Sequence, residues 1–400
     1  MHSVPSHSAS KPHDSDYSRN RARSIRFLIL LAAILALAFF LSLRAGSYNT
    51  PAAELIRGIF GRASDAKINL VIRNNRLPRI CTAMVAGAGL GLAGCILQAV
   101  LRNPLASAST LGVSQGATFG AAVAIIGLGL SQAGSWAIPL CSFLGSLLVA
   151  AVILGLSQFK QISSEGIVLA GVAISSMLTG ATTLLQYFAD EVALSSLVFW
   201  TFGDLGSTDW QSLRGMVLAV LLLIGYCYLH RWDYNALLSG EETALSLGIH
   251  VRRLTLTNVV LTCFVCSVIV SHVGLINFIG LVAPHIVRMV VGNNYIYLIP
   301  GSVLAGAALL LHNFPEGVLT FFAGTADPAL GLRTAAAIAL HNIPEGLAVA
   351  VPFAYATRSR AAGVLAALVS GLAEPLGAVL AWLFLRRFFT TGFLNGTVVL

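Results

Sequence analysis

The chain has 400 residues, of which 56% are apolar and only 10% are charged, and its mean hydropathy is +0.83. A soluble domain carries roughly 25% charged residues, so this composition excludes an ordinary soluble enzyme or binding module. The net charge of +8 is concentrated in loops and in the N-terminal tail, where membrane orientation explains it better than nucleic-acid binding. The sequence therefore predicts an all-α polytopic membrane protein with about eleven transmembrane helices.

The first predicted helix follows a polar tail. Residues 1–24 are rich in Ser, His, Asp and Arg, and we expect them to form a disordered cytoplasmic tail. The apolar run 25–43 has no small-residue cleavage site, which favours an uncleaved helix over a signal peptide. The other spans are expected at about 79–101, 115–132, 135–157, 166–187, 213–230, 254–272, 275–291, 298–323, 332–353 and 362–385.

The basic residues set the expected orientation. With the N-terminus inside, most loop arginines fall on the cytoplasmic side, as the positive-inside rule requires. The loop from Arg44 to Pro78 is an exception. The basic residues that would lie outside are Arg57, Arg62, Lys67, Arg73 and Arg76 in this loop, and Arg333, Arg386 and Arg387 later in the chain. Either the topology differs there or the outside charge has a purpose.

The six cysteines all lie in apolar stretches. Cys263 and Cys266 have helical i, i+3 spacing, but no second cysteine pair accompanies them, so core packing is favoured over metal or disulfide chemistry. The stretch from Ser239 to Glu242 fits a capping box, which predicts a short polar helix between two spans. No GxxxxGK[ST] pattern occurs, so we expect this chain neither to bind nor to hydrolyse nucleotide.

Several motifs before residue 310 occur in a recognisable order. They are Arg73–Arg79, Gln98, Arg102–Ala106, Leu111–Ala117, Trp200–Gly203, Gly240–Ala244, Leu247–Gly248, Gly274, Phe278–Leu281, Pro284–His285 and Arg288. In this order they resemble the FecCD-type permeases of ABC importers for iron-siderophore, haem or cobalamin. The resemblance covers about residues 25–310, which predicts a permease domain truncated at its C-terminal end.

That resemblance implies roles for particular residues. Arg76 and Arg79 would receive acidic side chains of a periplasmic or lipoprotein substrate-binding protein, since guanidinium groups pair well with carboxylates; the alternative is a pair of charges near the lipid headgroups. The short helix after residue 239 would contact a separate ATPase subunit; the alternative is an ordinary loop helix. Its candidate coupling residues are Gly240, Glu241, Glu242, Ala244 and Gly248. The resemblance also implies a second permease chain and a bacterial inner-membrane location.

Two copies of one metal-ligand pattern follow, His312–Gly317 and His341–Gly346. In each copy the His and Glu are four residues apart, so they share a helix face. A charged side chain in mid-bilayer costs on the order of 2.5–3.5 kcal/mol, so a divalent cation or protonation must offset the carboxylates of Glu316, Glu345 and Glu374. Imidazole with carboxylate suits zinc, iron or manganese better than calcium.

From about residue 311 to 386 the chain resembles the ZIP family of zinc and iron transporters. The resemblance implies one metal position from His312, Glu316, His341 and Glu345, and a second from Asn313, Asn342 and Glu374 with the two bridging glutamates. The segment 311–400 would hold only part of that family's helices, with zinc or iron as its metal. A structural polar cluster is the alternative.

Three functions remain open. The chain is either an importer permease with a ZIP-like C-terminal metal site, a ZIP-type transporter that uses importer helices as a scaffold, or a fusion product without transport activity. The importer half is favoured because it contributes more helices, the outer arginines and the candidate ATPase contact.

Overall fold

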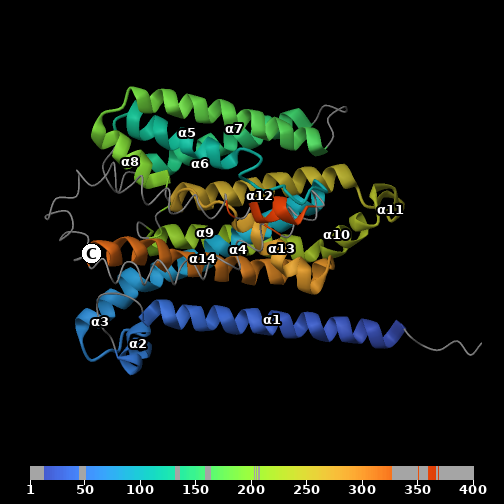
Figure 1. Cartoon of the computed structure of the whole chain (residues 1–400), viewed down its shortest axis with the longest axis horizontal. Helices are drawn as coiled ribbons and strands as arrows, with labels where there is room; N and C mark the ends of the chain where they lie inside the picture. Colours follow the sequence, from blue (N-terminus) through green and yellow to red (C-terminus); the bar gives the residue numbers. More distant parts are fainter. Residues whose placement is uncertain are drawn as a thin grey trace, which may run out of the picture. The chain divides into compact units, whose positions relative to one another are not determined.

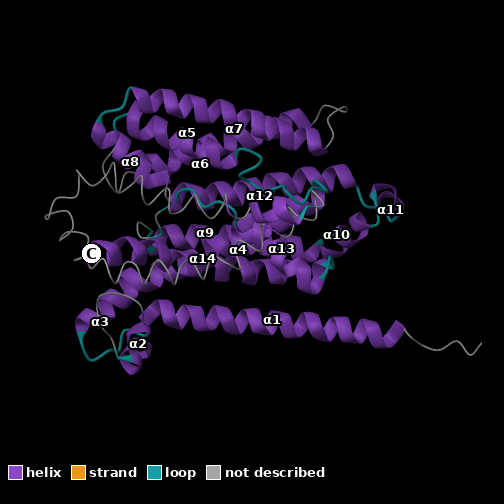
Figure 2. Cartoon of the chain, viewed as in Figure 1, coloured by secondary structure: helices purple, strands orange, loops and turns teal. Residues whose placement is uncertain are grey.

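The structure is a computed structural model that describes residues 13–44, 51–130, 136–157, 164–201 and 208–326, together with 203, 205, 350, 359–365 and 368. For residues 312–326 it describes the helix backbone. In these ranges the regular structure is entirely helical, joined by loops (Figure 2). The predicted all-α fold class is confirmed.

Six helical segments are long and apolar enough to cross a membrane, within the part of the chain described. They are Ser18–Arg44, Ala66–Val100, Ala137–Leu156, Gly166–Tyr187, Trp210–Leu229 and Val251–Val273. Four shorter apolar segments are Val113–Gly127, Glu191–Thr201, Ile279–Val291 and Tyr295–Leu311. Since about 20 apolar residues span the hydrocarbon core, each of the six long segments can cross a membrane by itself, and the four shorter ones are below this length.

The helices that coincide with expected spans are α1 (His13–Arg44), α4 (Leu77–Val100), α5 (Val113–Ala122) with η2 (Val123–Gly127), α6 (Ala137–Ser157), α7 (Ser164–Tyr187), α9 (Trp210–Leu229), α12 (Val251–Val273), α13 (Ile279–Val291) and α14 (Tyr295–Ala326). Helix α1 begins well before the expected start at residue 25, because no Gly or Pro interrupts residues 13–44. Part of the tail expected to be disordered is therefore helical. The expected spans 332–353 and, for the most part, 362–385 lie outside the described residues.

Five helical elements were not expected as separate elements. They are α2 (Ala52–Ile59), α3 (Ala66–Val71), η1 (Ile72–Arg76), α8 (Glu191–Thr201) and α10 (Arg231–Leu238). All five have eleven residues or fewer, so hydropathy over a membrane-length window does not detect them.

The chain divides into two compact units. One comprises Met1–Leu37 and Met84–Ala308, and the other Ala38–Ala83 and Leu309–Leu400. In the first unit α5 packs against both α6 and α7, and α12 packs against α6 (Figure 1). This unit holds most of the helices that position the candidate site.

Small residues bring α5 and α6 close together. A Cβ atom added to Gly145 would overlap the backbone carbonyl of Gly116, and one added to Gly120 would overlap that of Cys141. Helices in lipid associate through such close van der Waals packing, since lipid tails are as apolar as the side chains. The glycines at these three positions therefore set the α5–α6 distance.

Helix α10 is anchored by buried polar groups. The hydroxyl of Tyr234, which is fully buried, donates to Asn258 Oδ1 on α12 at 2.7 Å. The amide N–H of Tyr295 at the start of α14 donates to Asn235 Oδ1 at 2.9 Å. Because an unpaired buried polar group is costly, these bonds hold α10 in a defined place at one end of the bundle.

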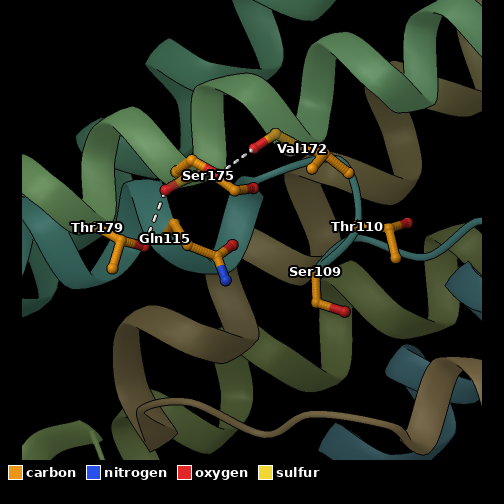
Figure 3. A pocket seen from close by; sticks show the side chains of 7 residues that line it. Ser109, Thr110, Gln115, Val172, Ser175 and Thr179 are labelled. Carbon is orange, nitrogen blue, oxygen red and sulfur yellow. Dashed lines mark hydrogen bonds between the residues drawn. The ribbon is translucent and has the colours of Figure 1, made fainter.

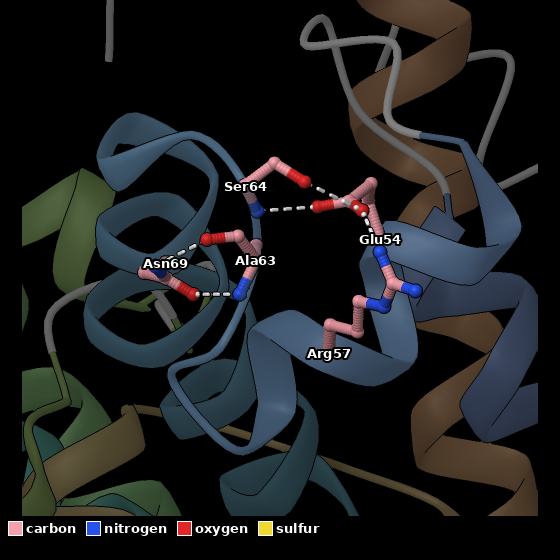
Figure 4. A network of polar contacts seen from close by, with 5 residues as sticks. All are labelled: Glu54, Arg57, Ala63, Ser64 and Asn69. Carbon is pink, nitrogen blue, oxygen red and sulfur yellow. Dashed lines mark hydrogen bonds and ion pairs between the residues drawn. The ribbon is translucent and has the colours of Figure 1, made fainter.

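In the second unit a hydrogen-bonded turn links α2 to α3 (Figure 4). Glu54 Oε2 accepts from the Ser64 amide N–H at 2.7 Å, and its Oε1 accepts from Ser64 Oγ at 3.0 Å and from Arg57 Nη1 at 2.9 Å. Asn69 exchanges two hydrogen bonds with the backbone of Ala63. The loop expected between the first two long helices is therefore folded.

The cysteines pack in the helical core, as predicted. Cys95, Cys227, Cys263 and Cys266 are buried, Cys81 and Cys141 are partly buried, and all six are free thiols.

Candidate functional site

The short helix expected after residue 239 is present as α11 (Glu241–Ser246). Its cap differs from the prediction: Ser239 is the C-cap of α10, and Gly240, with φ of 109°, is the N-cap of α11, with no capping bond from a side chain. The predicted capping box, with Ser239 as the N-cap, is therefore wrong. Helix α10 ends so close to α11 that only a residue tolerating positive φ can make the turn.

Helix α11 is fixed on one side and exposed on the other. Ala244 is buried with Leu237 and Val251, so α10, α11 and α12 share a small apolar cluster. Glu241, Glu242, Leu245 and Leu247 are exposed. Gly248, with φ of 83°, ends the element. The arrangement presents two carboxylates and two leucines on a rigid base, which suits contact with a partner protein.

One ion pair joins α11 to the loop after α4. Arg102 Nη2 lies 3.1 Å from Glu241 Oε2, and both side chains are about half exposed. Arg102 has φ of 48°, which is uncommon for a residue with a side chain. The loop of residues 102–112 thus leaves α4 through a sharp turn directly beside α11.

The rest of this loop is held by its own polar groups. Asn103 Oδ1 accepts from the Leu105 amide at 2.9 Å, and Thr110 Oγ1 accepts from the Ser107 amide at 2.8 Å. Thr110 Oγ1 also donates to the Ser107 carbonyl at 2.9 Å, and Ser107 Oγ lies 2.9 Å from Ser109 Oγ. Bonds of this kind replace the helical ladder in a turn and make the segment locally rigid.

The same loop forms one wall of a pocket with a volume of about 420 Å³ (Figure 3). Its lining comes from the loop, α5 and α7, and consists of Ser109, Thr110, Gln115, Val172, Ser175, Ser176 and Thr179. The lining has no formal charge, and six of its seven side chains carry a hydroxyl or amide group.

Most hydroxyl donors on α7 are used within the helix. Ser175 Oγ donates to the Gly171 carbonyl at 2.8 Å, Ser176 Oγ to that of Val172 at 3.1 Å, and Thr179 Oγ1 to that of Ser175 at 2.8 Å. A hydroxyl that donates in this way keeps its oxygen lone pairs as weak acceptors. Gln115 Oε1 is buried and accepts no hydrogen bond from the residues described. Such an atom calls for a partner supplied by water or a ligand.

Arg76 and Arg79 lie in the second unit. Arg76, at the end of η1, is partly buried, and its Nη1 donates to the Leu43 carbonyl in the last turn of α1 at 2.8 Å. A cation at a helix C-terminus stabilises its unpaired carbonyls. Arg79 is partly exposed on α4. Arg76 thus has a structural contact, and the docking role of both arginines stays a prediction.

The ZIP-like ligand set falls mainly outside the described residues. His341, Asn342, Glu345 and Glu374 are not described, and for His312, Asn313 and Glu316 the structure gives the backbone of α14. That helix continues through Pro315, so the first pattern lies within a helix as expected, and His312 and Glu316 occupy one helical face. The described residues contain no cluster of three or more His, Cys, Asp or Glu side chains suited to a metal ion.

The pocket residues on α7 were missed by sequence reasoning. Ser175, Ser176 and Thr179 stand at one helical face of an otherwise apolar span, and this polar stripe was the available signal. Gln115 lies in a motif already noticed, but its sequence position alone does not reveal a facing helix. Spatial pairing of the loop with α7 supplies that information.

Comparison with known proteins decides the family. The model of the FecCD transport family matches residues 34–314. The chain belongs to this family. It is 41% identical over 329 residues to a putative ABC transporter permease protein of Methanocaldococcus jannaschii, covering 77% of this chain and 94% of that protein. It is 33% identical over 317 residues to the vitamin B12 import system permease BtuC of Salmonella typhimurium, covering 79% of this chain and 93% of that relative.

A solved structure agrees with the family assignment. It is described as an inward-facing conformation of a putative metal-chelate type ABC transporter, with a TM-score of 0.64 and 30% identity, and the match covers 78% of this chain and 95% of that one. The chain is therefore a multi-pass membrane protein of the ABC permease family. A model of the ZIP zinc transporters also matches residues 293–397, overlapping the end of the FecCD match.

Proposed function

We propose that this FecCD-family chain is the membrane subunit of a binding-protein-dependent ABC importer for a metal chelate such as an iron-siderophore, haem or cobalamin. The observation that carries the proposal is the uncharged pocket lined by the 102–112 loop, Gln115 and the hydroxyl face of α7. Similarity to the vitamin B12 permease and to the putative metal-chelate transporter supports this substrate class.

The chemistry of the pocket suits passage better than storage. Since the α7 hydroxyl donors are already bonded to backbone carbonyls, the lining offers weak acceptors and the unpaired Gln115 Oε1. A transport path must hydrate or contact a polar substrate without holding it tightly, because strong sites slow release. An uncharged lining with few free donors meets this condition for a bulky chelate whose metal is already coordinated.

The proposed assembly has three partners. An ATPase subunit binds the exposed face of α11, where Glu241 and Glu242 lie beside two leucines. A periplasmic or lipoprotein binding protein contacts the end near Arg79, and a second permease chain completes the path. The orientation has the N-terminus in the cytoplasm of a bacterial inner membrane, and ATP hydrolysis takes place on the separate subunit.

The ATPase contact is tested by charge reversal on α11. Glu241→Lys and Glu242→Lys are expected to weaken co-purification of an ATP-binding subunit, because each replaces an exposed carboxylate by a cation. Uptake of radiolabelled cyanocobalamin, ferrichrome or haem by cells expressing the chain with its partners reports transport. Unchanged subunit recovery in both variants, or no ATP-dependent uptake of any of the three probes, would argue against the importer.

The outer arginines are tested at Arg79. Arg79→Glu is expected to lower the affinity for the binding protein by about tenfold or more, roughly 1.4 kcal/mol, since a buried charge pair at an interface becomes a repulsion. Arg76→Glu is a less clean test because Arg76 also donates to Leu43. An unchanged dissociation constant for Arg79→Glu would remove this residue from the docking surface.

A second function is favoured by the ZIP match at residues 293–397 and by the helical backbone through the first metal-ligand pattern. We propose that His312, Glu316, His341 and Glu345 hold zinc or iron, with Asn313, Asn342 and Glu374 at an adjoining position. Purified protein should retain metal, measured by mass spectrometry, and Glu316→Ala with Glu345→Ala should lose it. Equal metal content in the double variant would contradict the site while leaving the importer proposal intact.

A further inference from the structure

The ion pair between Arg102 and Glu241 joins two segments that lie far apart in the sequence. Its members are 139 residues apart, whereas the pairs Arg57–Glu54 and His230–Asp233 each join residues three apart. Both side chains are about half exposed, so the pair contributes little to global stability. The pair does, however, connect two segments that are far apart in the sequence, the 102–112 loop and α11.

One end of the pair belongs to a short helix that lies between two glycine turns. Glu241 is the first residue of α11, which is packed through Ala244 onto Leu237 and Val251. Gly240 and Gly248 flank this helix, both with positive φ. A force on the exposed face of α11 would therefore move the helix between two glycine turns, and Glu241 would move with it.

The other end belongs to a loop that behaves as one piece. Beyond Arg102, the bonds among Asn103, Leu105, Ser107 and Thr110 fix the loop internally. The backbone of Arg102 itself lies in the left-handed region, which marks the point where the loop departs from α4. A displacement of Arg102 would thus carry the loop as a unit.

The far side of the loop touches α7 directly. A Cβ atom on Gly171 would meet the Thr110 carbonyl at 2.7 Å, and one on Gly112 would meet the Gly171 carbonyl at 3.2 Å. Backbone therefore lies against backbone at this point, with no flexible side chain to absorb movement. Ser109 and Thr110 of the loop and Ser175 of α7 also line the pocket (Figure 3).

We propose that the Arg102–Glu241 pair is a strut that transmits movement of α11 to the 102–112 loop and so changes the pocket at α7. This inference rests on the proposed binding of an ATPase to α11 and adds the route by which that binding reaches the pocket. Arg102 is a positioning residue, since it acts through the loop. The contact is an ion pair through one nitrogen, so Arg102→Lys keeps the charge attraction to Glu241 and Arg102→Gln removes it.

The strut is tested by measuring the pocket wall in the assembled complex. Leu105 and Val172 are exposed, one on the loop and one on α7. Cysteines are introduced as Leu105→Cys and Val172→Cys, and Cys81 and Cys141 are replaced by Ser. Pulsed electron paramagnetic resonance in nanodiscs then measures the distance between spin labels on the two introduced cysteines. The sample is the chain with the ATP-binding subunit that co-purifies with it, measured without nucleotide and with ATP plus vanadate.

The expected result is a nucleotide-dependent shift in the label distance that Arg102→Gln abolishes and Arg102→Lys retains. Arg253→Glu, which changes an exposed cation on the neighbouring helix α12, serves as the matched control and should keep the shift. All variants should bind the ATP-binding subunit and melt at the same temperature as the parent.

Two results would overturn the strut. The shift would persist in Arg102→Gln, or it would disappear in both Arg102→Gln and Arg102→Lys, which would show that the cation is not what matters. Failure of the parent chain to recover any ATP-binding subunit would instead contradict the proposed function, and the strut with it.

Discussion

Helix α5 meets two neighbours in two different ways. Toward α6 it presents Gly116 and Gly120, and the backbones come so close that no side chain fits between them. Toward α7 it presents Gln115, and the space between is a pocket bordered by hydroxyl groups. The contrast shows how one short helix can serve both as a close structural contact and as part of a pocket lining: small residues close one side, and polar residues line the other.

The largest effect is expected from breaking the closed side. Gly145→Val places a branched side chain against the Gly116 carbonyl, so the helices must separate. Overpacking of this kind costs about 1–3 kcal/mol, and the upper end applies here because the clash is with backbone and no change of side-chain rotamer relieves it. The measurement is the thermal midpoint of the purified chain in detergent.

The matched control lies on the same helix. Gly155 also belongs to α6, but a Cβ atom added there meets nothing within 4 Å. Gly155→Val should therefore change the free energy of unfolding by less than about 0.5 kcal/mol. Equal destabilisation by the two substitutions would mean that the contact with α5 does not decide the outcome, since valine has a higher helix propensity than glycine.

The next effect is expected from filling the open side. Ser176→Phe puts a ring into the pocket and should slow uptake by about tenfold, equivalent to roughly 1.4 kcal/mol in the barrier, with little change in the thermal midpoint. The readout is uptake of whichever of the three chelates the parent transports. Leu184→Phe, at an exposed position of α7 outside the pocket lining, should leave uptake unchanged. Normal uptake in Ser176→Phe would exclude the pocket from the path.

A smaller effect separates polarity from shape. Gln115→Leu removes the buried Oε1 that accepts no hydrogen bond from the described residues. The free energy of unfolding should rise by about 1 kcal/mol, because the variant no longer buries an unsatisfied polar atom. Uptake should fall, since the pocket loses its amide. A loss of stability would show that the amide bonds to its surroundings and serves the fold.

These contrasts indicate how far the sequence can be interpreted alone. Apolar runs in the sequence predict nine of the helical spans, counting α5 with η2 as one, because lipid requires a certain length and an apolar composition of each span. The elements α2, α8 and α10 are too short to meet that criterion. The predicted N-cap of α11 is wrong, because Gly240 and not Ser239 makes the turn. The α11 helix itself could be predicted. The pocket could not, since Thr110 and Ser175 are joined only by tertiary packing.

The smallest effect concerns the hydrogen-bonded turn of the second unit, which has no part in the α5 contrast and shows what a solvated contact contributes. The Ser64 amide and hydroxyl, and then Arg57, hold the pKa of Glu54 below its ordinary value. A carboxyl group whose pKa is lowered by folding stabilises the folded form above its unfolded pKa, and that contribution is lost as the pH falls through the lowered value.

Protection of the Ser64 amide against hydrogen exchange, corrected for the intrinsic rate, should therefore decline on acidification below the ordinary range of a glutamate. Glu54→Gln should remove this pH dependence, because an amide does not titrate. A persisting decline in that variant would assign the titration to another group. The thermal midpoint should barely change in either case. An exposed hydrogen bond of this kind orders its own turn, whereas the α5–α6 backbone contact contributes to the stability of the whole fold.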